Sequence, residues 1–583
     1  MTGLAIKKRK LISRPMPTKL IIFCSILFTL IAGAETDKPP SGTHISFPIG
    51  VTEDNQPIPA WISVEDLDIH STRKRILLIA GMEGDKSTAI LAREALRSFG
   101  KSGLFREYSV SAILDANPGG NPVPAFPPEG KAYNDKKNPA TIYLWRFIGT
   151  HGPDLVIDLR PGDEFSIRMG KRSGGIDKAL AKALKAKTNA IPDSGLASAL
   201  WRNNPAGVGR VPAIQVTSGD KGGNAILEHI LTHLKEMPGG LPLSKARAQL
   251  QARANRTPIE TAHHLAHYYG QNPGTQYIPA LALVGRLRLA ELDNAPEHRS
   301  AVTSLLQPYA NGQKKALGKG VSGVNLSGHL AIAELAFRDK NQALARLVEA
   351  AAQRAHESRK NPKDPVSGHN QMSDSVFMVC PILAAAHALT GKAKYLEDCI
   401  AHLRYMRKID LRADGIYRHS PQDETAWGRG NGFPALGLAL SLGYLPRDAP
   451  GRDEILQAFR THIAALAKHQ DPTGMWHQVI DHPESYREMT STCMITFAMA
   501  RGIRMGWLDR KVYEPHVRKS WPAINQRIGT DGHLIDVCTG TGKQKNLRAY
   551  LDRTAILGKD SRGGSMALLA ATEMAALNLK PNR

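Results

Sequence analysis

The chain has 583 residues, 42% of them hydrophobic and 22% charged, which predicts two to four domains with sizeable cores and excludes long disordered spans. Its formal net charge of +23 either reflects a generally basic proteome or favours contact with polyanions such as sugar acids. Because the cations are scattered and form no dense Lys/Arg block, we expect no nucleic-acid partner.

Residues 1–34 have the pattern of a signal peptide. Six cations precede the apolar run LIIFCSILFTLIAG, and Ala32, Gly33 and Ala34 form a small-x-small cleavage site. The run is too short to span a bilayer comfortably. We therefore expect an exported protein, periplasmic or extracellular, with no stable membrane anchor after cleavage; an uncleaved anchor is the alternative.

Residues 45–240 alternate between strand-like and helix-like segments. The apolar run RILLIAG is followed by a helical pattern over 87–101, by the strand-like YSVSAILDANPGG, by a second helical pattern over 140–152, and by PDLVIDLRPGD. Alternation of this kind predicts an α/β domain with a mostly parallel sheet, whose functional loops follow the carboxyl ends of the strands.

The loops after these strands raise the question of a metal site. Their order, LLIAGMEGDK, LDANPGGN and PDLVIDLRPGD, resembles the zinc carboxypeptidase and succinylglutamate desuccinylase-like domains over about 150 residues. That resemblance places the zinc ligands on Glu83, Lys86 and Arg160. Because ammonium and guanidinium groups have no free lone pair, we expect no metal and no cofactor. Glu83, Lys86, Arg160 and Asp163 then form surface salt bridges or a pocket for an anionic group.

From about residue 250 onward, Ala/Leu-rich helical patterns replace the strands, and residues 238–258 look like the connection. About twelve helices paired at ~28-residue spacing predict an all-α (α/α)6 toroid over 250–583, with an open helical solenoid as the alternative. The predicted helices are 258–270, 277–293, 297–311, 326–338, 341–358, 373–390, 393–407, 431–444, 453–470, 487–506, 510–527 and 563–577.

Several loops of this half carry aromatic, His or Arg side chains beside glycines and lead into a helix. Such loops suit a sugar ring, which has an apolar face and a polar edge. In HNQMSDSVFMVCPILAAAHALTG, Asp374 stands at the mouth of an apolar helix, where it could also be a simple N-cap. The other loops are DGIYRHS, AWGRGNGFPALGLAL, GMWHQVIDHPESYREMTS and DGHLIDVCTGTG.

These motifs together resemble the unsaturated glucuronyl and rhamnogalacturonyl hydrolases of glycoside hydrolase families 88 and 105, over residues ~320–577. The resemblance implies hydration of the C4–C5 double bond that a polysaccharide lyase leaves on a non-reducing uronate. Asp374 would protonate C-4 and then, as carboxylate, accept a proton from the water that attacks C-5. One acid can serve both steps if its pKa is raised enough. The expected partners are acidic unsaturated oligosaccharides.

The same resemblance assigns the substrate-binding residues. His419, Trp427 and Arg429 match the positions that bind the unsaturated sugar, and His477 and Gln478 lie on another loop of the rim. Two positions depart from the family pattern. Asn325 stands where a second acid is usual and can neither hold a charge nor repel one. Phe433 replaces a tryptophan and lacks its indole N–H.

Two other functions remain open at this point. A non-catalytic protein that binds acidic oligosaccharides is one, favoured by the missing second acid and disfavoured by the intact Asp374. Another α/α-barrel carbohydrate enzyme, an epimerase or a lyase, would need a base such as His419 or Tyr417.

The cysteines that remain after the leader are far apart in the sequence and form no C-x-x-C motif, which excludes a zinc knuckle. In a chain of this size we expect buried thiols rather than a disulfide framework.

Overall fold

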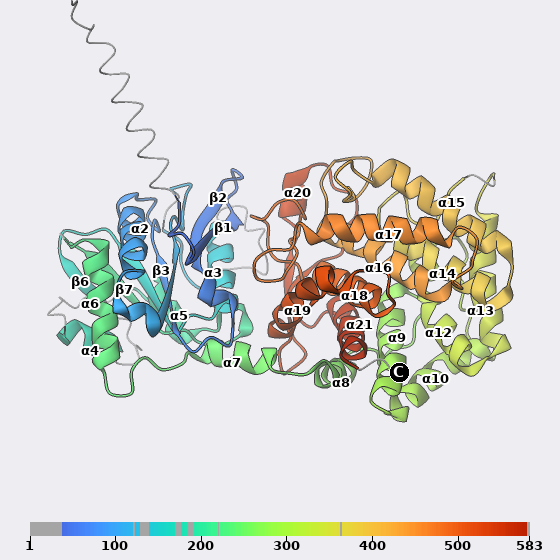
Figure 1. Ribbon diagram of the computed structural model, residues 1–583, viewed down its shortest axis with the longest axis horizontal. Coiled ribbons are helices and arrows are strands. Elements are labelled where there is room, and N and C mark those ends of the chain that lie inside the picture. Colours follow the sequence, from blue (N-terminus) through green and yellow to red (C-terminus); the bar gives the residue numbers. More distant parts are fainter. Residues whose placement is uncertain are drawn as a thin grey trace, which may run out of the picture.

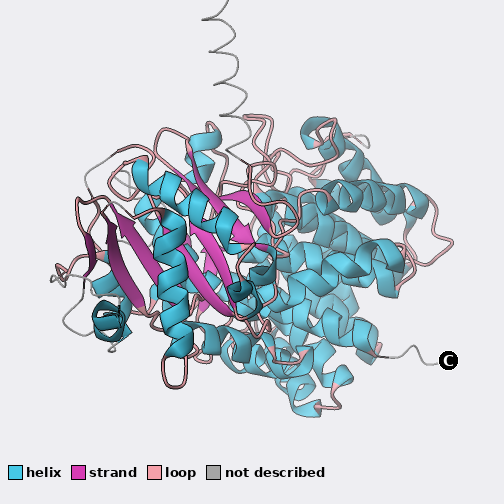
Figure 2. Ribbon diagram, turned by 60° about the vertical axis from the view of Figure 1, so that its left-hand side comes forward, coloured by secondary structure: helices cyan, strands magenta, loops and turns pink. Residues whose placement is uncertain are grey.

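The computed structural model describes residues 38–120, 123–128, 139–168, 176–183, 191–219, 221–361 and 364–579. The predicted signal peptide lies outside these residues. Within them, no helix is both long and apolar enough to cross a membrane. The chain forms two lobes side by side, a sheet-containing N-terminal lobe and a helical C-terminal lobe (Figures 1 and 2).

The N-terminal lobe is built on a seven-stranded sheet with the order β1-β2-β4-β3-β5-β7-β6. The central strands β4, β3, β5 and β7 are parallel, while β1, β2 and β6 pair antiparallel at the two edges. The sheet is therefore mixed rather than mostly parallel, and only its centre follows the prediction. The strands are β1 His44–Val51, β2 Pro57–Ser63, β3 Lys74–Ile79, β4 Tyr108–Ile113, β5 Leu155–Arg160, β6 Phe165–Arg168 and β7 Ala213–Ser218.

Helices cover both faces of this sheet, because the central strands are apolar on both sides. Apolar side chains of α2 Ser87–Phe99, α4 Ile176–Ala183 and α6 Gly223–Glu236 form the core on one face. Those of α3 Pro139–His151 and α5 Leu196–Arg202 form the core on the other. The predicted strands at 76–81, 108–114 and 153–163 and the predicted helices at 87–101 and 140–152 are confirmed as β3, β4, β5, α2 and α3.

The helical lobe is a closed ring of helix pairs. Six inner helices contact one another in the order α9, α12, α14, α16, α18 and α21, and α21 returns to contact α9, which excludes an open solenoid. Each inner helix also packs against an outer one, as in an (α/α)6 barrel. The inner helices are α9 Tyr277–Leu292, α12 Leu330–Asp339, α14 Ser375–Thr390, α16 Gly428–Tyr444, α18 Met489–Arg504 and α21 Ser561–Asn578. The outer ones are α8 Pro258–Tyr268, α10 Pro296–Ala310, α13 Gln342–Glu357, α15 Ala393–Asp410, α17 Arg452–Ala467 and α19 Arg510–Gln526.

The inner helices are buried almost all round, as their uniformly apolar sequences require. Gly437 lets α14 and α16 approach closely, because a Cβ at this position would lie 2.6 Å from the Cα of Phe377. The four cysteines of the described residues are buried free thiols, as expected. Smaller elements complete the lobe: α11 Gly323–Gly328, which overlaps the start of the helix predicted at 326–338, and α20 Leu547–Leu551 and the hairpin β8 Leu534–Cys538 with β9 Ala555–Gly558, which were not predicted from the sequence.

The two lobes share a packed junction. The predicted connection at 238–258 contains α7 Lys245–Ala254, which lies between the lobes (Figure 1) and contacts both α3 and α19. Arg247 on α7 forms a buried ion pair with Asp154, with 2.5 Å between Nη1 and Oδ2. Across the junction, Arg146 Nη1 lies 3.0 Å from Asp536 Oδ1, and both side chains are buried. One apolar core continues from the N-terminal lobe into the loops of the helical lobe.

Candidate active site

Asp374 directly precedes α14 at the N-cap position. Its side chain makes no capping hydrogen bond, so capping does not explain why an aspartate stands here. The carboxylate is 5% exposed and lies between two imidazoles. Its Oδ1 is 3.6 Å from Nε2 of His419 and its Oδ2 is 3.7 Å from Nε2 of His369. Two consecutive residues in the left-handed region, Asn370 and Gln371, lead into this segment. Backbone strain of this kind is concentrated at functional sites.

The electrostatics of Asp374 differ from the sequence-based expectation. Burial, the largest influence, raises the pKa of the carboxyl group, whereas the imidazoles of His369 and His419 lower it, and the net pKa lies below the ordinary value for aspartate. The expected raised pKa is thus wrong for this arrangement. At neutral pH Asp374 is a carboxylate, ready to act as a base, and a proton for the acid step must come from elsewhere or from a change on binding.

His419 links Asp374 to an aromatic group. Its Nδ1 shares a hydrogen bond of 2.9 Å with the hydroxyl of Tyr550 on α20. Its ring lies on Trp427, with 4.4 Å between the ring centroids, and the guanidinium of Arg429 covers the same indole at 4.6 Å. The structure therefore brings together Asp374, His419, Trp427 and Arg429, all of which the sequence predicted. Trp427 caps the start of α16 and Arg429 lies in its first turn.

Arg429 and Gln478 hold the loop that closes this group. Arg429 donates hydrogen bonds of 2.6 Å to the carbonyl oxygens of both Cys538 and Thr539. Gln478 Nε2 donates to the backbone carbonyl of Tyr550 at 3.3 Å. Gln478 thus belongs to the same cluster as His419, as predicted from its place on the rim.

Buried polar atoms of this cluster lack hydrogen-bond partners. Among the described residues, no partner is found for Asp374 Oδ1, His419 Nε2, Trp427 Nε1 or Gln478 Oε1. Nearly all buried polar groups in folded proteins are satisfied, so unsatisfied ones that gather in one place call for an explanation. Two acceptors, one indole donor and one imidazole nitrogen suit the hydroxyl groups of a sugar.

Asn325 and Phe433 have structural roles. Asn325 Nδ2 donates to the carbonyl oxygens of Thr275 at 2.7 Å and Ala316 at 3.1 Å, so its amide fastens two loops. Phe433 is buried inside the barrel and stacks on Phe377, with 5.2 Å between ring centroids. Among the described residues, neither side chain forms a hydrogen bond with Asp374, and the predicted substrate-binding roles of Asn325 and Phe433 stay predictions.

His477 contacts residues other than those around Asp374 and His419. Its Nδ1 donates to the carbonyl oxygen of Ser485 at 2.6 Å, and its Nε2 lies 3.3 Å from Oδ2 of Asp471. Both ring nitrogens are thus engaged in ordering the loop 471–487.

Three residues near the site were not singled out from the sequence. His369 lies in the HNQMSDS motif and could have been found there. Tyr550 lies in the short segment LRAYL, which carries no signal. Asp410 ends α15 and is fully buried, and neither of its carboxyl oxygens has a hydrogen-bond partner among the described residues. An acid at a helix C-terminus opposes the helix dipole, but that alone does not distinguish a site residue from an exposed acid.

The loops of the N-terminal sheet contain an ion-paired network. Arg160 binds Asp158 through Nε at 2.8 Å and Nη2 at 3.1 Å, and its Nη1 reaches Glu83 at 3.1 Å. Lys86 and Asp163 are exposed. Of the four residues predicted to form a network, the structure pairs Glu83 with Arg160 and adds Asp158, and a guanidinium enclosed by two carboxylates does not fit a zinc site. Among the described residues, no group of three or more His, Cys, Asp or Glu side chains could hold a metal ion.

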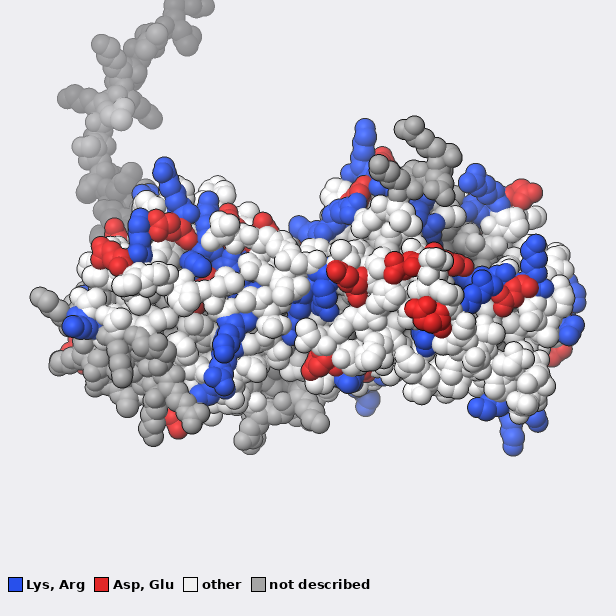
Figure 3. Space-filling model, turned by 90° about the horizontal axis from the view of Figure 1, so that it is seen from below, with Lys and Arg blue, Asp and Glu red and all other residues white. Residues whose placement is uncertain are grey.

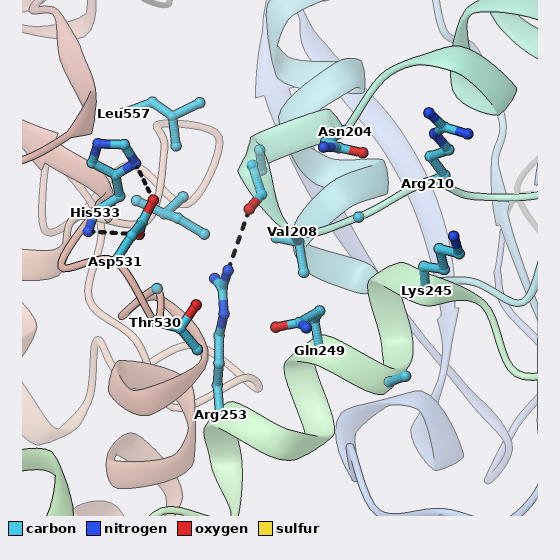
Figure 4. Close-up of a pocket in the computed structure, with 16 residues that line it drawn as sticks. Asn204, Val208, Arg210, Lys245, Gln249, Arg253, Thr530, Asp531, His533 and Leu557 are labelled. Atoms are coloured by element: carbon cyan, nitrogen blue, oxygen red, sulfur yellow. Dashed lines mark hydrogen bonds and ion pairs between the residues drawn. The ribbon is translucent and has the colours of Figure 1, made fainter. Parts of the chain in front are cut away.

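A cavity of about 830 Å³ lies between the lobes, away from Asp374. Figure 4 shows Arg210, Lys245 and Arg253 on one side of it, and an ion pair of His533 with Asp531 on the other, 2.8 Å apart. Arg253 donates to the carbonyl oxygen of Gly207 at 3.2 Å and is therefore already engaged. On the face seen in Figure 3, cations are spread over both lobes, including their junction. None of the predicted site residues lines this cavity.

A closed barrel of helix pairs with a buried acid, two imidazoles and an aromatic group beside it defines an α/α-barrel protein with a polar cluster at the start of its inner helices. The family model described as Glycosyl Hydrolase Family 88 matches residues 251–578, more than half of the chain. The chain therefore belongs to this family. No comparison identifies the N-terminal lobe.

The chain is similar to an unsaturated rhamnogalacturonyl hydrolase, YesR, of Bacillus subtilis, at 32% identity over 27% of this chain and 43% of that protein. It is also similar to an unsaturated 3S-rhamnoglycuronyl hydrolase of Formosa agariphila, at 30% identity over 28% of this chain and 48% of that protein. The chain thus spans about half the length of these curated relatives. A solved family 88 hydrolase from Bacteroides vulgatus aligns with 55% of this chain and 100% of its own, at 19% identity and a TM-score of 0.47.

Proposed function

We propose that the protein hydrates the C4–C5 double bond of an unsaturated uronic acid at the non-reducing end of an oligosaccharide, and thereby releases the rest of the sugar. The observation that carries this proposal is the set of unsatisfied polar atoms around Asp374 in a member of this family. The relatives named above act on unsaturated rhamnogalacturonyl and rhamnoglycuronyl substrates. The proposal includes the expected export of the chain.

In this reaction the site must move two protons. One proton binds to C-4 of the sugar, the oxygen of a water molecule binds to C-5, one proton of that water goes to Asp374, and its other proton stays on the new hydroxyl group. The hemiketal at C-5 then opens and the glycosidic bond breaks. Asp374 as carboxylate fits the second transfer. His419 and Trp427 lie beside it and offer a nitrogen and an indole N–H to the sugar ring.

The substrate itself favours the first transfer. A uronate brings a carboxylate to a buried site that already holds Asp374, and like charges at close range raise the pKa of a carboxyl group. Substrate binding therefore raises the pKa of Asp374, whereas the two imidazoles lower it.

The decisive experiment follows the ultraviolet absorbance of the conjugated uronate in lyase-generated oligosaccharides, with the wild-type protein and Asp374→Asn side by side. We expect the wild type to remove the signal and the variant to be slower by about 10²–10⁴-fold. Asparagine caps a helix as well as aspartate does, so a purely structural role for Asp374 predicts no such loss. Oligosaccharides from pectic, ulvan and glycosaminoglycan polymers identify the substrate class.

The outcomes separate the proposal from its alternative. If no oligosaccharide loses its signal while binding is still measurable by calorimetry, the protein is an oligosaccharide-binding protein rather than a hydrolase. Equal hydration rates for the wild type and Asp374→Asn would show that Asp374 has no catalytic role.

A further inference from the structure

Asp410 is a buried acid whose side chain forms no hydrogen bond or ion pair that would stabilise the described part of the fold. Its side chain is fully buried at the last residue of α15, and neither carboxyl oxygen has a hydrogen-bond partner among the described residues. Burial of an unpaired carboxylate is costly. The helix gains nothing from it either, because a negative charge at a helix C-terminus faces the negative end of the dipole.

Two backbone hydrogen bonds connect the segment of Asp410 with the segments of the candidate active site. Its backbone carbonyl accepts a hydrogen bond of 3.0 Å from the N–H of Arg418, the residue before His419. The carbonyl of His419 in turn accepts a hydrogen bond of 2.9 Å from the N–H of Ser373, the residue before Asp374. Backbone pairing therefore places Asp410, His419 and Asp374 in three adjoining segments.

The charges around Asp410 leave its carboxyl group unpaired. The guanidinium of Arg418 donates to the carbonyl of Ile409 rather than to Asp410, with 2.9 Å from Nε to the oxygen. Burial raises the pKa of Asp410 to about 8, with a further contribution from the charge of Asp374 and opposing ones from Arg418 and Lys543. The titratable groups that face it from the neighbouring segments are Asp374, Tyr417, Arg418, Lys543 and Tyr550.

We propose that Asp410 is the second acidic group of this site and acts as the proton partner of Asp374. The inference rests on the proposed function. Asp410 gives its proton to a water molecule in the site, that water gives one of its protons to an oxygen of Asp374, and Asp374 then transfers this proton to C-4 of the sugar. After the water that attacks C-5 has given a proton to Asp374, a proton returns to Asp410 by the same route, and both groups regain their starting states. Asp410 acts through Asp374 and is a positioning residue.

The test is the pH profile of the hydration rate in the wild type, Asp410→Asn and the control Asp414→Asn. Asp414 lies four residues further on, is partly exposed and pairs with Arg412, so its loss leaves the site intact. We expect the wild-type rate to fall as the pH rises through about 8, where Asp410 loses its proton. Asp410→Asn loses about tenfold or more in kcat at neutral pH, together with that alkaline limb, whereas Asp414→Asn keeps the wild-type profile.

A second measurement does not depend on activity. Between the unfolded pKa of aspartate and about pH 8 the folded wild type binds one proton more than the unfolded chain, so its stability falls as the pH rises. The denaturant midpoint of Asp410→Asn relative to wild type should therefore rise up to about pH 8 and stay level above it.

The results distinguish this inference from the function on which it rests. A wild type without activity contradicts the proposed function. An active wild type whose pH profile Asp410→Asn reproduces contradicts the inference alone. A midpoint difference that does not vary between about pH 5 and 9 also contradicts it, whatever the activity.

Discussion

Replacing Asn325 with aspartate tests whether this position can still serve as an acid. Its Nδ2 donates to the carbonyl oxygens of Thr275 and Ala316 and, at 3.1 Å, to the hydroxyl of Thr275. A carboxylate would turn the two carbonyl contacts into contacts between acceptors, while the hydroxyl could turn to donate. Two lost hydrogen bonds at about 1 kcal/mol each, with a charge facing two carbonyl dipoles, predict a loss of about 2–3 kcal/mol at neutral pH.

The assay is denaturant unfolding of the wild type, Asn325→Asp and Asn325→Ala at several pH values. A carboxyl group facing carbonyl oxygens has a raised pKa, so the extra loss in Asn325→Asp should be present at neutral pH and shrink on acidification, when the protonated group can donate again. Asn325→Ala loses these bonds, the bond to the Thr275 hydroxyl and the bond of 3.3 Å that Oδ1 accepts from the N–H of Gly318, but it introduces no charge, so its deficit should not vary with pH. An Asn325→Asp variant that matches the wild type in stability and exceeds it in activity would refute the structural role of this amide.

Two further predictions concern the site and the junction. Tyr550→Phe removes the hydroxyl bonded to Nδ1 of His419 and to the N–H of Gln544 and keeps the ring, so kcat should fall about tenfold, with a loss of stability of about 1–2 kcal/mol; an unchanged kcat would mean that the bond to His419 does not orient its ring. Arg146→Met removes the ion pair that Arg146 forms with the buried carboxylate of Asp536 and should cost about 2 kcal/mol, seen as a lower unfolding midpoint that Arg146→Lys partly restores. A loss below about 0.5 kcal/mol would contradict a packed junction.

Secondary structure was predictable where one physical signal dominated. All twelve predicted helices of the C-terminal half are present, because their apolar residues recur with helical spacing and Gly, Pro or Asp residues separate them. The segment predicted at 326–338 is divided at His329 into α11 and α12. The antiparallel edge strands were missed. β1 contains Pro48 and β6 has four residues, and such strands give little periodic signal.

The residues of the candidate site were likewise predictable only where a local sequence motif marks them. Asp374, His419, Trp427 and Arg429 belong to loop motifs that precede helices, and the closed ring brings those loops together. Asp410 was not predicted, because its significance depends on burial and on missing partners, and neither can be read from local sequence. The structural role of Asn325 likewise depends on carbonyl groups that come from two other loops.

The N-terminal lobe contributes to this site through its contacts with α20. Arg548 on α20 donates a hydrogen bond of 2.7 Å to the carbonyl oxygen of Thr52, at the end of β1. Two residues further on, Tyr550 reaches His419, and its ring belongs to the apolar core that both lobes share. Trp427 is buried in the same core. The N-terminal lobe, in whose described residues no group of side chains could hold a metal ion, still fixes the position of two side chains that contact His419. A mutation that disrupts the junction should therefore disturb the site from a distance.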